Sequence, residues 1–169
     1  MESERVLLSK PSNVSGMNSM SGVSGKSDTK VSWSIRPMTI EDYEQAFSLW
    51  EHMEGLAVSE ADSREQIERY LNHNPGCSFV CDIGNGIAGT VLAGHDGRRG
   101  FLYHLAVDSA WRGRGIGEHL VEHALQALRQ EGIDKCHIFV ISGNEQGERF
   151  WLSHGWEKRD SFHVFSRSL

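Results

Sequence analysis

A glycine-rich loop separates an apolar segment from an amphipathic one, and this succession constrains the fold more than any other feature of the chain. Residues 101–107 are nearly all apolar and predict a central strand, whereas residues 115–130 have helical periodicity and stop before Gly132. Between them, residues 112–117 carry three glycines at alternate positions and two arginines. A strand-to-helix turn of this kind gathers backbone N–H groups at a helix N-terminus, where phosphate is attracted.

Composition limits the class of protein and its partners. The chain has 169 residues and a formal net charge of −6 at pH 7, so we expect one domain with a tail and neither nucleic acid nor an anionic membrane as a partner. No apolar run approaches 18 residues. The three cysteines are odd in number and form no Cys-x-x-Cys motif, which favours a reducing, cytoplasmic location.

The first 31 residues differ from the remainder. Eight of the first thirty are serine and none is aromatic. Such a segment buries too little apolar surface to offset its ordering entropy. We therefore expect a disordered Ser-rich tail over residues 1–31 and a folded domain over residues 32–169.

The order of the predicted elements indicates an α/β fold. The expected strands cover residues 31–36, 77–83, 87–93, 101–107, 136–141, 156–158 and 161–166, and the expected helices cover 39–53, 59–72, 115–130 and 144–154. Thr39 followed by Asp42 is typical of a helix cap, and Gly84-Asn85-Gly86 of a hairpin turn. This order predicts a single mixed, mostly antiparallel twisted sheet with helices on both faces.

Three nucleotide-binding motifs compete for the glycine-rich loop, with a turn that binds nothing as the alternative. A Walker loop requires Gly-Lys-Ser/Thr, which is absent, and a dinucleotide fingerprint requires a glycine where Glu118 or Leu120 stands. The remaining motif, Arg-x-x-Gly-x-Gly, is matched by residues 112–117. Here the chain resembles the GNAT superfamily of acyl-CoA-dependent N-acetyltransferases, whose corresponding loop binds the pyrophosphate of coenzyme A.

The resemblance extends over residues 33–166. Leu105-Ala106-Val107 resembles the strand that binds the pantetheine arm, and Asn144 with residues 150–156 resembles the family's Asn-then-Phe-Tyr-x-x-x-Gly-Phe segment. The turn at residues 95–100, His-Asp-Gly-Arg-Arg-Gly, is similar to the turn of a subset of bacterial members of this family, whose substrates are mostly unassigned. The resemblance implies the acyl-CoA N-acyltransferase fold, acetyl-CoA as cosubstrate, and a cofactor site made of Leu105, Ala106, Val107, Arg112, Gly113, Arg114, Gly115, Ile116, Gly117, Glu118, Asn144 and Trp151.

The chain departs from the family pattern at the acid and base positions. Trp151 stands where many relatives carry a tyrosine acid, and Phe101 and Phe139 match two positions where relatives place a glutamate base. Nearby candidates are His104 and Tyr103, and histidine is the residue type better suited to act as a base near neutral pH. Strand alternation predicts that these two point to opposite faces, and packing in the core is the alternative role for each.

Two other polar groups receive weaker functional interpretations. His119-Leu-Val-Glu-His123 matches an inverted zinc-protease pattern, but helical periodicity places both histidines on a solvated stripe, so we expect no metal. Glu51, His52 and Glu54 near the end of the first helix could meet a cationic acceptor or could simply be solvated.

The sequence thus predicts acetyl transfer from acetyl-CoA to a primary amine of a small molecule or peptide, by direct attack, with water or His104 as proton acceptor. A non-catalytic acyl-CoA-binding sensor is the alternative, since the usual tyrosine and glutamates are missing. The identity of the acceptor is left open, and so is the choice between a monomer and the homodimer common among relatives.

Overall fold

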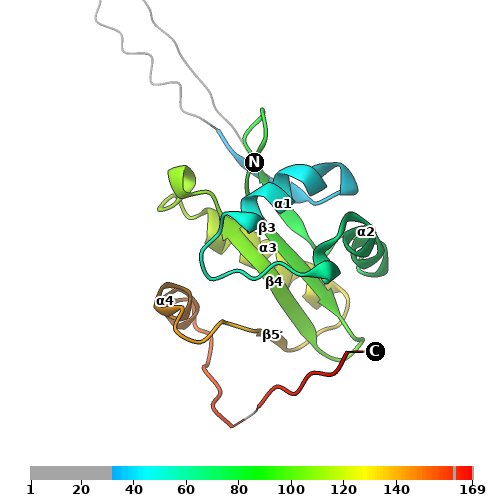
Figure 1. The fold of residues 1–169 in the computed structure, drawn as a ribbon, viewed down its shortest axis with the longest axis vertical. Coiled ribbons are helices and arrows are strands. Elements are labelled where there is room, and N and C mark those ends of the chain that lie inside the picture. The colour runs from blue at the N-terminus through cyan, green and yellow to red at the C-terminus, as the bar shows by residue number, and fades with distance from the viewer. Residues whose placement is uncertain (1–31, 162, 169) are drawn as a thin grey trace, which may run out of the picture. The chain divides into compact units, whose positions relative to one another are not determined.

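Five strands form one sheet, and their order in space follows their order in the chain, β1-β2-β3-β4-β5 (Figure 1). The structure is a computed structural model that describes residues 32–161 and 163–168. The tail expected at residues 1–31 lies outside the described residues. Neighbouring strands are antiparallel except β4 and β5, which are parallel. The strands are β1 (Ser34–Pro37), β2 (Phe79–Asp82), β3 (Ile87–His95), β4 (Gly100–Val107) and β5 (Cys136–Ile138).

Helices cover both faces of this sheet, as the sequence predicts. The helices are α1 (Tyr43–Glu51), α2 (Arg64–His73), α3 (Ile116–Gln130) and α4 (Glu145–Ser153), with 3-10 turns η1 (Ile40–Asp42), η2 (Glu60–Asp62) and η3 (Ser109–Trp111). Trp50 of α1 and Ile67 of α2 are buried in one apolar cluster, and Leu120 of α3 and Trp151 of α4 in the other. None of the helices in the described ranges has the length and apolar composition that a bilayer crossing needs.

Two capping boxes start the helical segments on the α1–α2 face. The Thr39 amide donates to Asp42 (2.9 Å), as the sequence predicts, and the Ser59 amide donates to Asp62 (2.8 Å). Arg36 of β1 also donates to Asp42 (2.7 Å). Burial alone would raise the pKa of Asp42, but the bonds from Arg36 and Thr39 outweigh it and the pKa lies below its ordinary value.

A β-bulge interrupts β4 where it pairs with β3. Thr90 lies opposite Ala106 and Leu92 opposite Tyr103, so β4 has one residue more than β3 in this interval. His104 occupies the left-handed region with φ 51°, which L-residues adopt at a cost of about 1–2 kcal/mol. It is the one non-glycine residue with positive φ among those described.

The bulge contradicts the predicted alternation of Tyr103 and His104. Tyr103 packs edge-on against Tyr70 of α2, and His104 packs against Trp50 of α1. Both side chains therefore lie on the α1–α2 face. The prediction of opposite faces is wrong because the extra residue shifts the alternation by one position.

A buried hydrogen-bond chain holds the bulge. Trp50 Nε1 donates to Thr90 Oγ1 (2.8 Å), and Thr90 Oγ1 donates to the carbonyl oxygen of His104 (2.9 Å). Trp50 and Thr90 are both fully buried. Two core side chains thus fix the backbone that carries His104.

Strands β4 and β5 separate soon after they meet. Their pairing covers three residues on each strand, ending at Leu102 and Ile138. The predicted strand 136–141 is therefore too long, because residues beyond Ile138 have no partner strand. Phe139 and Ile141 are left 58% and 47% exposed.

The strands predicted at residues 156–158 and 161–166 are absent from the described residues of those ranges. Trp156 packs against Trp151, whereas residues 157–161 and 163–168 are exposed. Residues 157–160 are four consecutive charged side chains, one of which, Lys158, forms an ion pair with Glu148. Alternation predicted these strands, but a strand also needs a partner edge, and β5 is only three residues long.

We expect Thr90→Val to destabilise the fold by about 1–3 kcal/mol, because it leaves the buried Trp50 N–H without an acceptor. Thr90→Ser keeps the hydroxyl and is the matched control, with a cost limited to one buried methyl group, about 1 kcal/mol. Urea unfolding followed by tryptophan fluorescence measures both. A valine variant as stable as the serine variant would show that the hydroxyl does not support the bulge.

Candidate functional site

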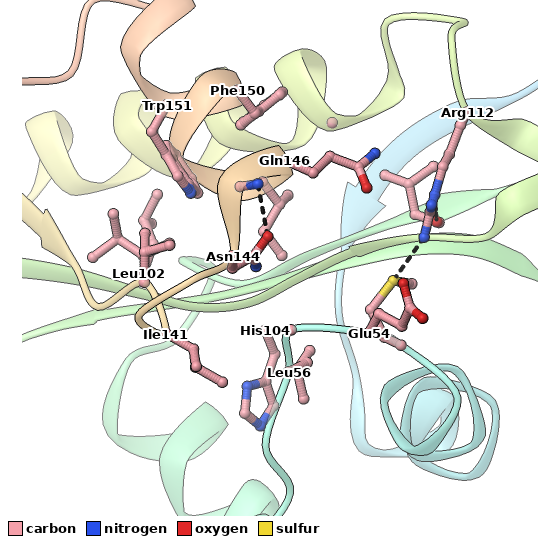
Figure 2. A pocket seen from close by; sticks show the side chains of 18 of the residues that line it. Glu54, Leu56, Leu102, His104, Arg112, Ile141, Asn144, Gln146, Phe150 and Trp151 are labelled. Carbon is pink, nitrogen blue, oxygen red and sulfur yellow. Dashed lines mark hydrogen bonds between the residues drawn. The ribbon is translucent and has the colours of Figure 1, made fainter.

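A cavity of about 560 Å³ lies where β4 and β5 separate. Its lining comes from the α1–α2 connection (residues 53–57), from β4, from residues 111–118, from residues 138–141 and from α4. In Figure 2, Asn144, Gln146, Phe150 and Trp151 lie on one side of β4, and His104, Leu56 and Ile141 lie on the other. The cavity thus passes through the opening in the sheet, and its size suits a small-molecule ligand.

One end of the cavity is formed by the glycine-rich loop and the start of α3. Gly113 (φ 74°) and Gly115 (φ 77°) are both left-handed, which explains why glycine stands at these positions. None of the backbone amides of residues 112–118 donates to a backbone carbonyl. The next amide along the chain, that of His119, donates to Gly115. These N–H groups, together with the helix dipole, suit a diphosphate.

The two loop arginines point in different directions. Arg112 Nε donates to the Val107 carbonyl (3.1 Å), and its guanidinium reaches Met53 Sδ (3.0 Å) across the cavity mouth (Figure 2). The guanidinium of Arg114 lies 4.8 Å from the Trp111 ring centroid and does not line the cavity. Both cations remain near the start of α3, where they add to its positive potential.

The start of α4 forms the opposite wall. Asn144 caps this helix by accepting a hydrogen bond from the Gly147 amide (2.8 Å). Its side chain also contacts Gly55, where an added Cβ would lie 2.2 Å from Asn144 Nδ2. The α1–α2 connection therefore touches α4 across the cavity, and Gly55 has no room for a side chain.

Trp151 contributes both to the core and to the wall. Its ring is 7% exposed and packs edge-on against Trp156 (4.8 Å) and Phe150 (5.1 Å). Its indole N–H has no hydrogen-bond partner among the described residues. It is nevertheless accessible to solvent, because Tyr70 Oη is the one buried side-chain polar atom without a partner in the described chain. The N–H is therefore open to the cavity that this residue lines.

Most residues predicted for the site line this one cavity. They are Tyr103, His104, Leu105, Val107, Arg112, Gly113, Gly115, Ile116, Gly117, Glu118, Asn144 and Trp151. Arg114 does not line it, and Ala106 is buried in the cluster below α1 and α2. In the α1–α2 connection, sequence reasoning considered only Glu54, as a contact for a cationic acceptor; Met53, Gly55, Leu56 and Ala57 were missed because the segment carries no motif.

His104 and Asp62 form a pair at the α1–α2 side of the cavity. His104 Nε2 lies 2.6 Å from Asp62 Oδ1, and the two side chains are 13% and 10% exposed. Asp62 is held in turn by the Ser59 amide and by Tyr43 Oη, which donates to its carbonyl (2.9 Å). A proton on Nε2 directed at Asp62 leaves Nδ1 as a proton acceptor, an arrangement suited to general-base chemistry. Sequence reasoning gave Asp62 no role beyond its place in the helix expected over residues 59–72.

The other acid–base candidate, Tyr103, is a poor base. Burial raises the pKa of the Tyr103 phenol above its ordinary value, so the hydroxyl stays protonated at neutral pH. Its ring lies beside the rings of Phe101 and Phe139. This part of the cavity is therefore aromatic, and His104 supplies its basic nitrogen.

The remaining polar candidates lie at or outside the margin of the cavity. Glu54 lines it and is exposed, whereas Glu51 and His52 do not line it. His119 is exposed on α3 and packs edge-on against Trp33. The residues that the structure describes contain no group of three or more histidine, cysteine or acidic side chains arranged to hold a metal.

Comparison with known sequences identifies relatives of this chain. Residues 38–156 match the model of the Acetyltransferase (GNAT) family. Over 135 residues the chain is 32% identical to an acetyltransferase of Yersinia enterocolitica, an alignment that covers 80% of this chain and 95% of that protein. An acetyltransferase of Pectobacterium atrosepticum is 36% identical over 111 residues, which are 66% of this chain and 78% of that protein.

Solved structures share the fold at low sequence identity. The PaiA N-acetyltransferase of Thermoplasma acidophilum, determined in complex with coenzyme A, has a TM-score of 0.68 at 18% identity and covers 78% of this chain and 93% of its own. An aminoglycoside acetyltransferase from an uncultured soil metagenomic sample has a TM-score of 0.62 at 20% identity, with 81% and 96% covered. From the family match and the sequence relatives together, we conclude that the chain belongs to the GNAT family of acetyltransferases.

Proposed function

We propose that residues 32–169 form an N-acetyltransferase domain that transfers the acetyl group of acetyl-CoA to a primary amine of a small molecule or peptide. The observation that carries this proposal is the continuity of one cavity from the N-terminus of α3 to the His104–Asp62 pair. Within the family, the turn at residues 95–100 groups the chain with the bacterial Asp-Gly-Arg-Arg-Gly subset.

In this proposal the donor lies along the cavity from α3 to α4. The N–H groups of residues 112–118 bind the pyrophosphate, with Arg112 and Arg114 adding positive charge. The edge of β4 at residues 105–107, which β5 leaves uncovered, receives the pantetheine arm. Asn144 and Trp151 lie beside the thioester.

The chemistry is direct attack of a neutral amine nitrogen on the thioester carbonyl. A C–N bond forms, the C–S bond breaks, and coenzyme A leaves as a thiolate that takes a proton. His104 Nδ1 accepts the proton released by the attacking nitrogen, directly or through water, while Asp62 positions the ring. Trp151 offers an N–H donor but no acidic proton, so water protonates the thiolate. Most of the rate then comes from alignment of the two reactants.

The donor site is tested by calorimetry with coenzyme A. We expect the double charge reversal Arg112→Glu with Arg114→Glu to weaken binding at least tenfold, since it replaces attraction of the diphosphate by repulsion. Arg98→Glu with Arg99→Glu is the matched control, because it makes the same charge change in the exposed β3–β4 turn outside the cavity. An equal loss of affinity for coenzyme A in the two double variants would mean that coenzyme A does not bind at the loop. Absence of binding to the parent protein would refute the donor site.

The base is tested by His104→Ala with acetyl-CoA and the fastest acceptor in a panel of primary amines. We expect the turnover rate, followed as free thiol, to fall about 100-fold. Imidazole added to the solution should restore part of the rate, because it enters the space left by the ring. A purely structural role of His104 would give a slow variant that imidazole does not rescue.

The same assay separates the enzyme from the alternative sensor. Tight binding of coenzyme A with no thiol release for any amine would identify a non-catalytic acyl-CoA-binding module. Thiol release with accumulation of the acetylated amine would identify the transferase.

A further inference from the structure

Three aromatic side chains form a surface beside His104, called here the aromatic shelf: Phe101 and Tyr103 of β4, and Phe139 beyond β5. Their ring centroids are 6.3 to 6.5 Å apart in all three pairs, and Phe101 is nearly parallel to both of the others, at 18° and 16°. Tyr70 of α2 supports the shelf edge-on against Tyr103. The bulge in β4 puts this surface and His104 on the same face.

Two of the three side chains of the shelf, Tyr103 and Phe139, line the cavity, whereas Phe101 does not. Phe139 is 58% exposed and Tyr103 is 37% exposed, and both line the same cavity as His104. Ile141, which lies on the same side of β4 as His104 in Figure 2, is 47% exposed and lines it too. Exposed large apolar side chains gathered at one place mark a binding surface. These side chains therefore offer apolar surface to a ligand that shares the cavity with His104.

The charges around this end of the cavity limit the acceptor further. Among the described residues, Glu54 and Glu118 are the carboxylates that line the cavity, and Glu118 lies in the first turn of α3, at the donor end. Glu54 follows Met53, which contacts Arg112 of the loop, so it too lies toward the donor end. At the acceptor end, the carboxylate of Asp62 is already paired with His104. A polyamine or an aminoglycoside carries several positive charges that this surface would leave unpaired, at a desolvation cost.

We propose that the acceptor is a small primary monoamine that carries a flat aromatic ring, which stacks on the aromatic shelf while its nitrogen faces His104. This inference rests on the proposed acetyltransferase function and names its substrate class. The two rings that line the cavity, Tyr103 and Phe139, are tilted by 33° to each other and offer both faces and edges. A planar aromatic ring gains more from such side chains than a saturated ring of equal carbon number does. The cavity also has to hold the arm of the donor, which restricts the acceptor to a small molecule.

The test is equilibrium binding rather than turnover. Calorimetry compares 2-phenylethylamine with 2-cyclohexylethylamine, which has the same carbon skeleton but a saturated ring, on the full chain loaded with coenzyme A. We expect the phenyl compound to bind about two- to tenfold more tightly. Phe139→Leu keeps an apolar side chain without the flat ring, and should bring the ratio of the two affinities close to one. Phe165→Leu is the matched control, since Phe165 is 93% exposed and outside the cavity, and should keep the ratio.

Each outcome decides the inference separately from the proposed function. Equal binding of the two amines by the parent protein, or a ratio that survives Phe139→Leu, would overturn the aromatic acceptor. Faster thiol release from acetyl-CoA with spermidine than with 2-phenylethylamine would overturn it as well, while leaving the acetyltransferase intact. A phenyl preference lost only in Phe139→Leu, with no thiol release for any amine, would support the shelf as a ligand site and refute the transferase.

Discussion

The left-handed turn at His104 determines which side chains meet in the cavity. In a regular strand, Tyr103 and His104 would project from opposite faces, and one of them would enter the α3 side. The extra residue in β4 brings both to the α1–α2 face, where His104 reaches Asp62 and Tyr103 joins Phe139. The backbone strain of this turn is about 1–2 kcal/mol, comparable to the contribution of one or two buried hydrogen bonds. The chain from Trp50 through Thr90 provides two such bonds.

The separation of β5 from β4 complements the bulge. Because the two strands pair over only three residues each, the cavity runs through the sheet and has walls from both helical layers (Figure 2). In the proposed function, the donor approaches from the side of α3 and α4, and the acceptor approaches from the side of α1 and α2. The two reactants then meet at the opening while each binds to a different wall of the cavity. This geometry favours direct transfer.

The sequence predicted what depends on local patterns and missed what depends on distant partners. Apolar periodicity and glycine placement located all four helices and the loop at residues 112–117. The bulge has no local signature, since its support comes from Trp50 and Thr90, which lie 54 and 14 residues before His104 in the numbering. Asp62 likewise reaches His104 over 42 residues. The strands expected after residue 155 failed for the same reason, because alternation cannot show that an edge is available for pairing.

Aromatic residues stand where the resemblance placed acids and bases, and this substitution affects the proposed chemistry directly. Phe101, Phe139 and Trp151 offer no titrating group, but Phe139 and Trp151 present apolar surface to the cavity. An ammonium group moved from water onto such a surface loses hydration, which lowers its pKa and raises the fraction of neutral amine. The neutral form is the nucleophile. A desolvated acceptor therefore needs less help from a base, and one histidine with water suffices to carry away its proton. The missing glutamates are consistent with catalysis, provided that the acceptor is apolar enough to lie on this surface.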